Sequence, residues 1–185
     1  MSIFTRDNIP QDEFTKIGEW SYGAPSVSRA YSGCKLEIGK FCSFGAGIQI
    51  AFWGKHQMQD ISTYPFNILQ GWPPVTGTLV EGENIFIGND VWIGHNALIM
   101  QGAYIEDGAV VGAHSIVGGH VNPYALVVGN PAKEVRKRFP EDQIQKLVEM
   151  TWWNWPIEKV RQHLQIISSP NVELLHQIWL TEIKK

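Results

Sequence analysis

The sequence predicts a mainly β protein, a left-handed parallel β-helix that carries an inserted loop and a C-terminal α-helical tail. Three observations predict it. An aliphatic residue recurs at every sixth position from 87 to 117, small residues recur in register with it, and glycines follow it. A period of six fits neither an amphipathic helix nor an alternating strand. It fits short strands joined by corners, and hexapeptide repeats of this kind are typical of a parallel β-helix.

The main ladder contains only β-branched aliphatic residues, which we expect to point into a triangular prism: Ile87, Ile93, Ile99, Ile105, Val111 and Val117. Four positions after each lies a residue of small or modest size: Val91, Ala97, Ala103, Ala109, Ser115 and Val121. One position after, four of six residues are glycine, where we expect corner conformations that a side chain would hinder: Gly88, Gly94, Gly112 and Gly118. Three hexads make one coil, so residues 87–122 supply two coils.

The same six-residue spacing occurs earlier in the chain. Ile38, Phe44 and Ile50 add about one more coil, and residues 17–35 form a less regular first coil. The ladder is then broken by an insert at residues 51–86, which holds His56 and Trp72. Because a long loop on a rigid scaffold is more often functional than ornamental, we expect the insert to carry the site.

The tail reads as helical. A first helix has Pro140 and two acids in its first turn, and Ile144, Leu147, Val148 and Thr151 or Trp152 then follow at helical spacing. A second begins at Pro156, with Ile157, Val160 and Leu164 on one face, and a third covers 172–183. We expect residues 1–135 to form the β-helix domain, with its insert at 51–86, and residues 136–185 to form a tail. Trp152, Trp153 and Trp155 then dock this tail onto the prism.

Composition excludes several classes. The 185 residues include 15 Lys and Arg against 18 Asp and Glu, a near-balance that argues against a nucleic-acid binder, and the 44% of hydrophobic residues exclude disorder. Charged residues make up only 18%, below the roughly 25% of a typical chain, as expected if copies of the chain cover one another. No run approaches the ~18 apolar residues of a membrane helix, the first ten residues carry charges where a signal peptide needs an apolar stretch, and two cysteines make no disulfide framework. We therefore expect a cytoplasmic protein with no membrane insertion.

Four separated motifs resemble the hexapeptide acyltransferases and, within them, the xenobiotic acetyltransferases: HQMQDISTYPF at 56–66, IGNDVWIGH at 87–95, VGNPAKEVRKRF at 128–139 and WWNWPIEK at 152–159. This subgroup holds type B chloramphenicol acetyltransferases, streptogramin A acetyltransferases and related polysaccharide O-acetyltransferases. The resemblance covers roughly residues 17–160. It implies a homotrimer, acetyl-CoA as donor, no metal, and an active site between neighbouring subunits.

The resemblance implies that His56 is the general base. An alcohol must lose its proton as it attacks a thioester, and histidine is the best-matched base near neutral pH. Both substrates can occupy the cleft together, so no covalent acyl-enzyme is needed. Two departures stand beside His56: Lys55 replaces the usual Asn, and Gln59 stands where an acid is common, with Asp60 one place later. A nearby ammonium would lower the pKa of the imidazole, which a general base could tolerate.

The remaining site residues also follow from the resemblance. Cations suit the phosphates of CoA, and the matching residues are Lys133 and Arg136, followed by Lys137 and Arg138. The pantetheine arm would lie along Gly94, His95 and Ala113, chiefly through backbone groups. Gly118, Gly119 and His120 stand where relatives often carry Thr-Lys, so one donor to CoA is missing or replaced. Candidates for contact with the acceptor are Tyr22, Trp53, Asp60 and Tyr64, together with Trp72.

Two other classes remain open. A γ-carbonic-anhydrase-like zinc enzyme on the same scaffold would use His95, His114 and His120, although their spacing does not match that family's ligand pattern. A catalytically silent trimeric scaffold is the other, and the complete His56 loop argues against it. The acceptor is also open between a saccharide and a hydroxyl-bearing antibiotic such as chloramphenicol, and we favour the saccharide slightly.

Overall fold

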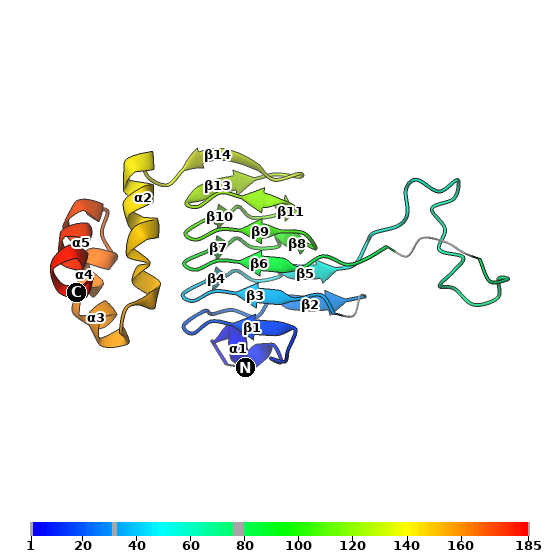
Figure 1. Ribbon diagram of the computed structural model, residues 1–185, viewed down its shortest axis with the longest axis horizontal. Coiled ribbons are helices and arrows are strands. Elements are labelled where there is room, and N and C mark those ends of the chain that lie inside the picture. Colours follow the sequence, from blue (N-terminus) through cyan, green and yellow to red (C-terminus); the bar gives the residue numbers. More distant parts are fainter. Residues whose placement is uncertain (1, 31–32, 76–79, 185) are drawn as a thin grey trace.

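The computed structural model describes residues 2–30, 33–75 and 80–184, and it is built around a three-sided β-prism (Figure 1). The described strands form three sheets. The first holds β1 (Thr15–Ile17), β3 (Leu36–Ile38), β6 (Ile85–Ile87), β9 (Tyr104–Ile105) and β12 (His120–Val121). The second holds β4 (Ser43–Phe44), β7 (Trp92–Ile93), β10 (Val110–Val111), β13 (Ala125–Val128) and β14 (Lys133–Lys137). The third holds β2 (Ser26–Arg29), β5 (Gln49–Phe52), β8 (Leu98–Met100) and β11 (Ile116–Val117).

From β3 to β13, consecutive strands pass through the three sheets in a fixed order, so three strands complete one coil. Neighbouring strands within each sheet are parallel, except that β14 turns back antiparallel along β13. The predicted parallel β-helix is therefore confirmed. The coils also continue directly across the insert, because Ile38 pairs with Ile87 and Ile50 with Ile99.

Burial confirms both interior ladders. Every member of the main aliphatic ladder is at most 3% exposed, and the small residues four positions later are at most 4% exposed. Members of the main ladder stack on one another between coils, as in the pairs Ile87–Ile105 and Ile93–Val111. One continuous hydrophobic core results.

The expected role of the ladder glycines was wrong. Gly88, Gly94, Gly112 and Gly118 do not adopt the left-handed conformation. Instead, most of them let the next coil approach closely: a Cβ on Gly94 would lie 2.6 Å from the backbone nitrogen of Ala113. The left-handed residues form a further ladder, three positions after the aliphatic one, which the sequence analysis missed. It comprises Phe41, Gly47, Asp90, Asn96, Gly102, Gly108 and His114, and Trp20 and Tyr124 follow Ile17 and Val121 at the same spacing.

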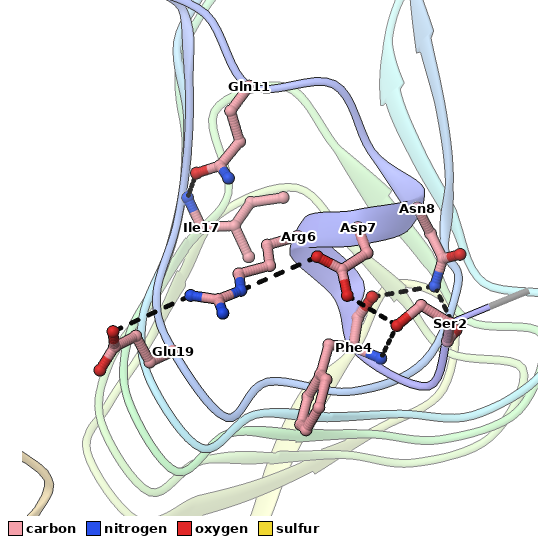
Figure 2. A network of polar contacts seen from close by, with 8 residues as sticks. All are labelled: Ser2, Phe4, Arg6, Asp7, Asn8, Gln11, Ile17 and Glu19. Carbon is pink, nitrogen blue, oxygen red and sulfur yellow. Dashed lines mark hydrogen bonds and ion pairs between the residues drawn. The ribbon is translucent and has the colours of Figure 1, made fainter.

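A short N-terminal element covers the first coil. Helix α1 (Thr5–Asn8) lies beside β1, and polar side chains tie it in place (Figure 2). The Ser2 hydroxyl donates to Asp7 at 2.7 Å, Arg6 lies 3.9 Å from both Asp7 and Glu19, and Gln11 accepts from the backbone of Ile17.

The tail consists of α2 (Glu141–Met150), the 3-10 turn η1 (Trp152–Asn154), α3 (Ile157–Gln162), α4 (Leu164–Ile167), α5 (Val172–Ile178) and the π-helical turn η2 (Trp179–Ile183). It lies on the side of the prism away from the insert (Figure 1). Trp152, Trp153 and Trp155 are buried as expected, and the Trp152 ring lies 4.8 Å from that of Phe41. Two expectations were wrong: Val148 is 38% exposed while Met150 is buried, and α3 ends before Leu164, which is 54% exposed.

The predicted bounds of the insert were also wrong. Strand β5 extends to Phe52 and β6 begins at Ile85, which leaves the described residues 53–75 and 80–84 outside the coils. Ala51 and Phe52 are almost fully buried. Because they pack into the core, the strand continues two residues beyond Ile50. The insert reaches far out from the prism (Figure 1). Among the described residues, no helix combines the length and apolar character that a membrane crossing requires.

The close approach of the coils can be tested with Gly39→Ala. A Cβ at this position would lie 2.5 Å from the carbonyl oxygen of Gly88, so we expect the free energy of unfolding to fall by about 1–3 kcal/mol in urea titrations. The matched control is Gly119→Ala, because nothing lies within 4 Å of a Cβ there. Equal effects of the two substitutions would contradict this account of the glycines.

Candidate functional site

Residues of the insert make up most of the lining of a cavity of about 1020 Å³. His56, Asp60 and Tyr64 line it together with the turn around Gly33 and Cys34. Three of the residues proposed from the sequence therefore come together in space. The other residues proposed from the sequence do not line this cavity.

His56 is held by its own loop. Its Nδ1 lies 2.7 Å from the carbonyl oxygen of Thr63. Because a carbonyl only accepts hydrogen bonds, Nδ1 carries the proton and Nε2 presents its lone pair. The ring itself is exposed. This places an oriented acceptor for a proton at the cavity.

Lys55, the departure next to His56, forms an ion pair with Glu83 across the base of the insert, with 2.7 Å between Nζ and Oε1. Neither Glu83 nor Thr63 was predicted from the sequence as a partner of this loop. Glu83 is 28 positions from Lys55, and no repeat or motif links them, so only the three-dimensional structure could reveal the contact.

Tyr22 and Trp53 do not line the cavity. Tyr22, on the first coil, bridges to Phe4 and Ser43 and is 45% exposed. The Trp53 indole donates to the Ser28 hydroxyl at 2.6 Å. Inside the insert, the Phe66 ring lies 4.7 Å from that of Tyr64 and 4.9 Å from that of Trp72, so these aromatic residues pack on one another.

The residues matched to the pantetheine arm gather at one corner of the prism. Gly94 and His95 lie one coil below Ala113, and the backbone nitrogen of His114 donates to the carbonyl of His95 at 2.9 Å. Gly94 is buried, whereas His95 and Ala113 are exposed. At this corner the backbones of two coils approach closely, and His95 and Ala113 beside them are accessible.

The four cations near the end of the coils divide into two pairs. Lys133 and Arg136 are exposed on β14, the edge strand. Lys137 donates to the carbonyl of Pro123, and Arg138 forms a 3.1 Å ion pair with Asp90 and donates to the carbonyl of Gly108. Lys137 and Arg138 are therefore tied into the fold, which leaves Lys133 and Arg136 as the accessible pair.

Burial shifts the pKa values of two ionisable groups in the prism, Asp90 and Cys42. It raises the pKa of Asp90, an effect that the Arg138 guanidinium opposes. It also raises the pKa of the Cys42 thiol to about 12. Because the thiolate is the nucleophilic form of cysteine, Cys42 is poorly suited to covalent catalysis.

The zinc alternative needs three imidazoles at one place. His95 and His114 have ring centroids 5.7 Å apart, but His120 lies on another sheet, 2.5 Å from Glu106. Within the described parts of this single chain, no group of three or more His, Cys, Asp or Glu residues is arranged to hold a metal ion.

Comparison with known proteins places this geometry in a family. Residues 84–119 match the model of the bacterial transferase hexapeptide (six repeats). The chain is 43% identical over 151 residues to a chloramphenicol acetyltransferase of Klebsiella aerogenes, covering 79% of this chain and 72% of that one. It is 37% identical over 174 residues to a virginiamycin A acetyltransferase of Staphylococcus aureus, covering 86% and 79%.

A solved structure agrees. The hexapeptide-repeat acetyltransferase of Vibrio cholerae, complexed with acetyl-coenzyme A, aligns with a TM-score of 0.51 and 27% identity over 69% of this chain. The alignment spans 62% of that protein, slightly less than two thirds of its length. Repeat, fold and sequence identity lead to one conclusion: the chain belongs to the hexapeptide-repeat acetyltransferases, in the subgroup of the chloramphenicol and virginiamycin A acetyltransferases.

Proposed function

We propose that this chain is an acetyl-CoA-dependent O-acetyltransferase that acts on a hydroxyl of a small acceptor, with His56 as general base. The observation that carries the proposal is the hydrogen bond from Nδ1 of His56 to the Thr63 carbonyl, at the edge of a cavity large enough for a drug-sized molecule. That bond leaves Nε2 as the proton acceptor.

The chemistry follows from that arrangement. His56 Nε2 takes the proton of the acceptor hydroxyl while the hydroxyl oxygen attacks the thioester carbonyl. The new C–O bond forms, the C–S bond breaks, and the proton held by His56 passes to the departing sulfur. Direct transfer needs no nucleophile from the protein, in keeping with the protonated state of Cys42.

The residues present fit the donor. Exposed Lys133 and Arg136 offer two cations for its phosphates, and the corner at Gly94 brings backbone so close that a Cβ would collide with Ala113. His95 and Ala113 stay accessible beside that step. Acetyl-CoA supplies the activated acetyl group, and these residues would hold it.

For the acceptor we propose a hydroxyl-bearing antibiotic, which reverses the slight preference for a saccharide. The support comes from the curated relatives, whose names specify chloramphenicol and virginiamycin A. Asp60 and Tyr64 line the same cavity as His56, and Phe66 adds an aromatic ring to its lining. Contacts from Tyr22 and Trp53 remain predictions, since neither lines this cavity within one chain.

We further propose a homotrimer of left-handed coils that works in the cytoplasm, with residues 1–135 as the coil domain and 136–185 as its tail. The insert exposes large apolar side chains, including Met58 at 84% and Ile68 at 69%, as it extends from the prism (Figure 1). Exposed apolar surface of this kind favours coverage by another copy of the chain. The two cysteines are free thiols, as suits a reducing compartment.

The function is tested by the release of free thiol from acetyl-CoA in the presence of chloramphenicol, virginiamycin M or a panel of sugars. We expect release with at least one of the antibiotics, and we expect His56→Ala to reduce it at least about 100-fold, the size of a lost general base. The oligomeric state should not change. More than a tenth of the wild-type rate in His56→Ala would contradict its role as base.

The donor site is tested separately with Lys133→Ala combined with Arg136→Ala. Loss of two charge-assisted contacts to phosphate should raise the KM for acetyl-CoA by about tenfold or more and leave the KM for the acceptor unchanged. A change confined to the acceptor KM would show that these cations do not hold the donor.

A further inference from the structure

We propose that Gln101, Glu83 and Lys55 form a clasp that closes the base of the insert and positions His56 for proton transfer. The inference rests on the proposed function of His56. It assigns a positioning role to three residues, none of which touches the reacting atoms.

Gln101 is the fixed end of the clasp. It follows β8 and is only 4% exposed, one of few buried polar side chains in the described structure. Its Oε1 accepts from the backbone nitrogen of Glu83 at 3.0 Å, and its Nε2 donates to the carbonyl of Trp53 at 3.4 Å. Trp53 begins the insert and Glu83 lies next to its end, so one buried amide ties both ends to the coil.

The backbone around Gln101 strengthens this attachment. Its own nitrogen donates to the carbonyl of Ala51 at 2.9 Å, and the nitrogen of Gly102 donates to the carbonyl of Asn84 at 3.1 Å. Ala51 lies just before the insert, and Asn84 is its last residue. Because a buried amide that loses its partners carries a desolvation cost, the ends of the insert are held to the rigid prism rather than left to move.

Lys55 and Glu83 extend the attachment to the catalytic loop. Glu83, held by Gln101 through its backbone, receives the ammonium of Lys55 through its carboxylate at 2.7 Å. Lys55 directly precedes His56. An exposed ion pair adds little to global stability. Here it joins the residue before the base to the far end of the insert, and a displacement of the base by about 1 Å is enough to slow catalysis.

The contacts therefore form a path from the coil to the base: Gln101 to Glu83, Glu83 to Lys55, and Lys55 to its neighbour His56, whose ring is fixed on its far side by Thr63. Positioning of this kind changes kcat more than substrate affinity, since it acts on the geometry of the proton acceptor.

The test uses Gln101→Met, Glu83→Gln and Lys55→Met, and the exchanged pair Lys55→Glu with Glu83→Lys. We expect each single change to lower kcat about tenfold with the KM for acetyl-CoA within about twofold, and the exchanged pair to recover most of the loss. The matched control is Glu173→Gln, which breaks an exposed 2.6 Å ion pair with Lys146 in the tail and should leave kcat unchanged.

Amide hydrogen exchange gives a readout that does not depend on activity. Residues 53–60 should exchange faster in the three single variants, at the wild-type rate in Glu173→Gln, and near it in the exchanged pair. Wild-type exchange and wild-type kcat in the single variants would overturn the clasp, as would an exchanged pair no better than its single components.

Failure of the clasp and failure of the proposed function have different signatures. An active wild type with an inactive His56→Ala and unaffected clasp variants contradicts the clasp alone. Undiminished activity in His56→Ala contradicts the proposed function, while the exchange rates of residues 53–60 still decide whether the clasp exists.

Discussion

The close stacking of one coil on the next is the constraint on which the rest of this structure depends. Parallel pairing sets Ile87 on Ile105 and Ile93 on Val111, so every position of a hexad meets its counterpart in the neighbouring coil. That contact requires aliphatic side chains inside the prism and leaves no room for a Cβ at Gly39 or Gly94. A rigid scaffold results, on which loops can be held in defined places.

The site draws on that rigidity in two ways. The corner at Gly94 and the edge strand β14 are parts of the prism, and they carry the residues proposed to hold the donor. The base lies on the insert, four residues after the end of β5, and is held by the contact to Thr63 and by the attachment through Gln101. The cavity beside His56 and the donor residues do not coincide within one chain, which fits a site completed by a neighbouring copy.

Features that repeat one residue type could be predicted from the sequence, and features that occur once were found only where a motif marks them. The burial of Ile87 and of the five residues that follow it at steps of six could be predicted, because six positions reinforce one pattern. The left-handed ladder through Asp90 and His114 also repeats, but it mixes residue types and was missed. The pairing of Arg138 with Asp90, and of Lys55 with Glu83, involves single distant contacts that leave no period. His56 was found only through its motif, since a lone exposed histidine has no distinguishing pattern.

The claim that matters most is that the loop leaves Nε2 of His56 as the proton acceptor. Nitrogen-15 NMR of the histidine-labelled protein, with His56→Gln used to assign the signal, measures the tautomer directly at a pH where the ring is neutral. The account predicts the Nδ1–H form, with the proton directed to the carbonyl of Thr63. A ring with its proton on Nε2 would contradict it.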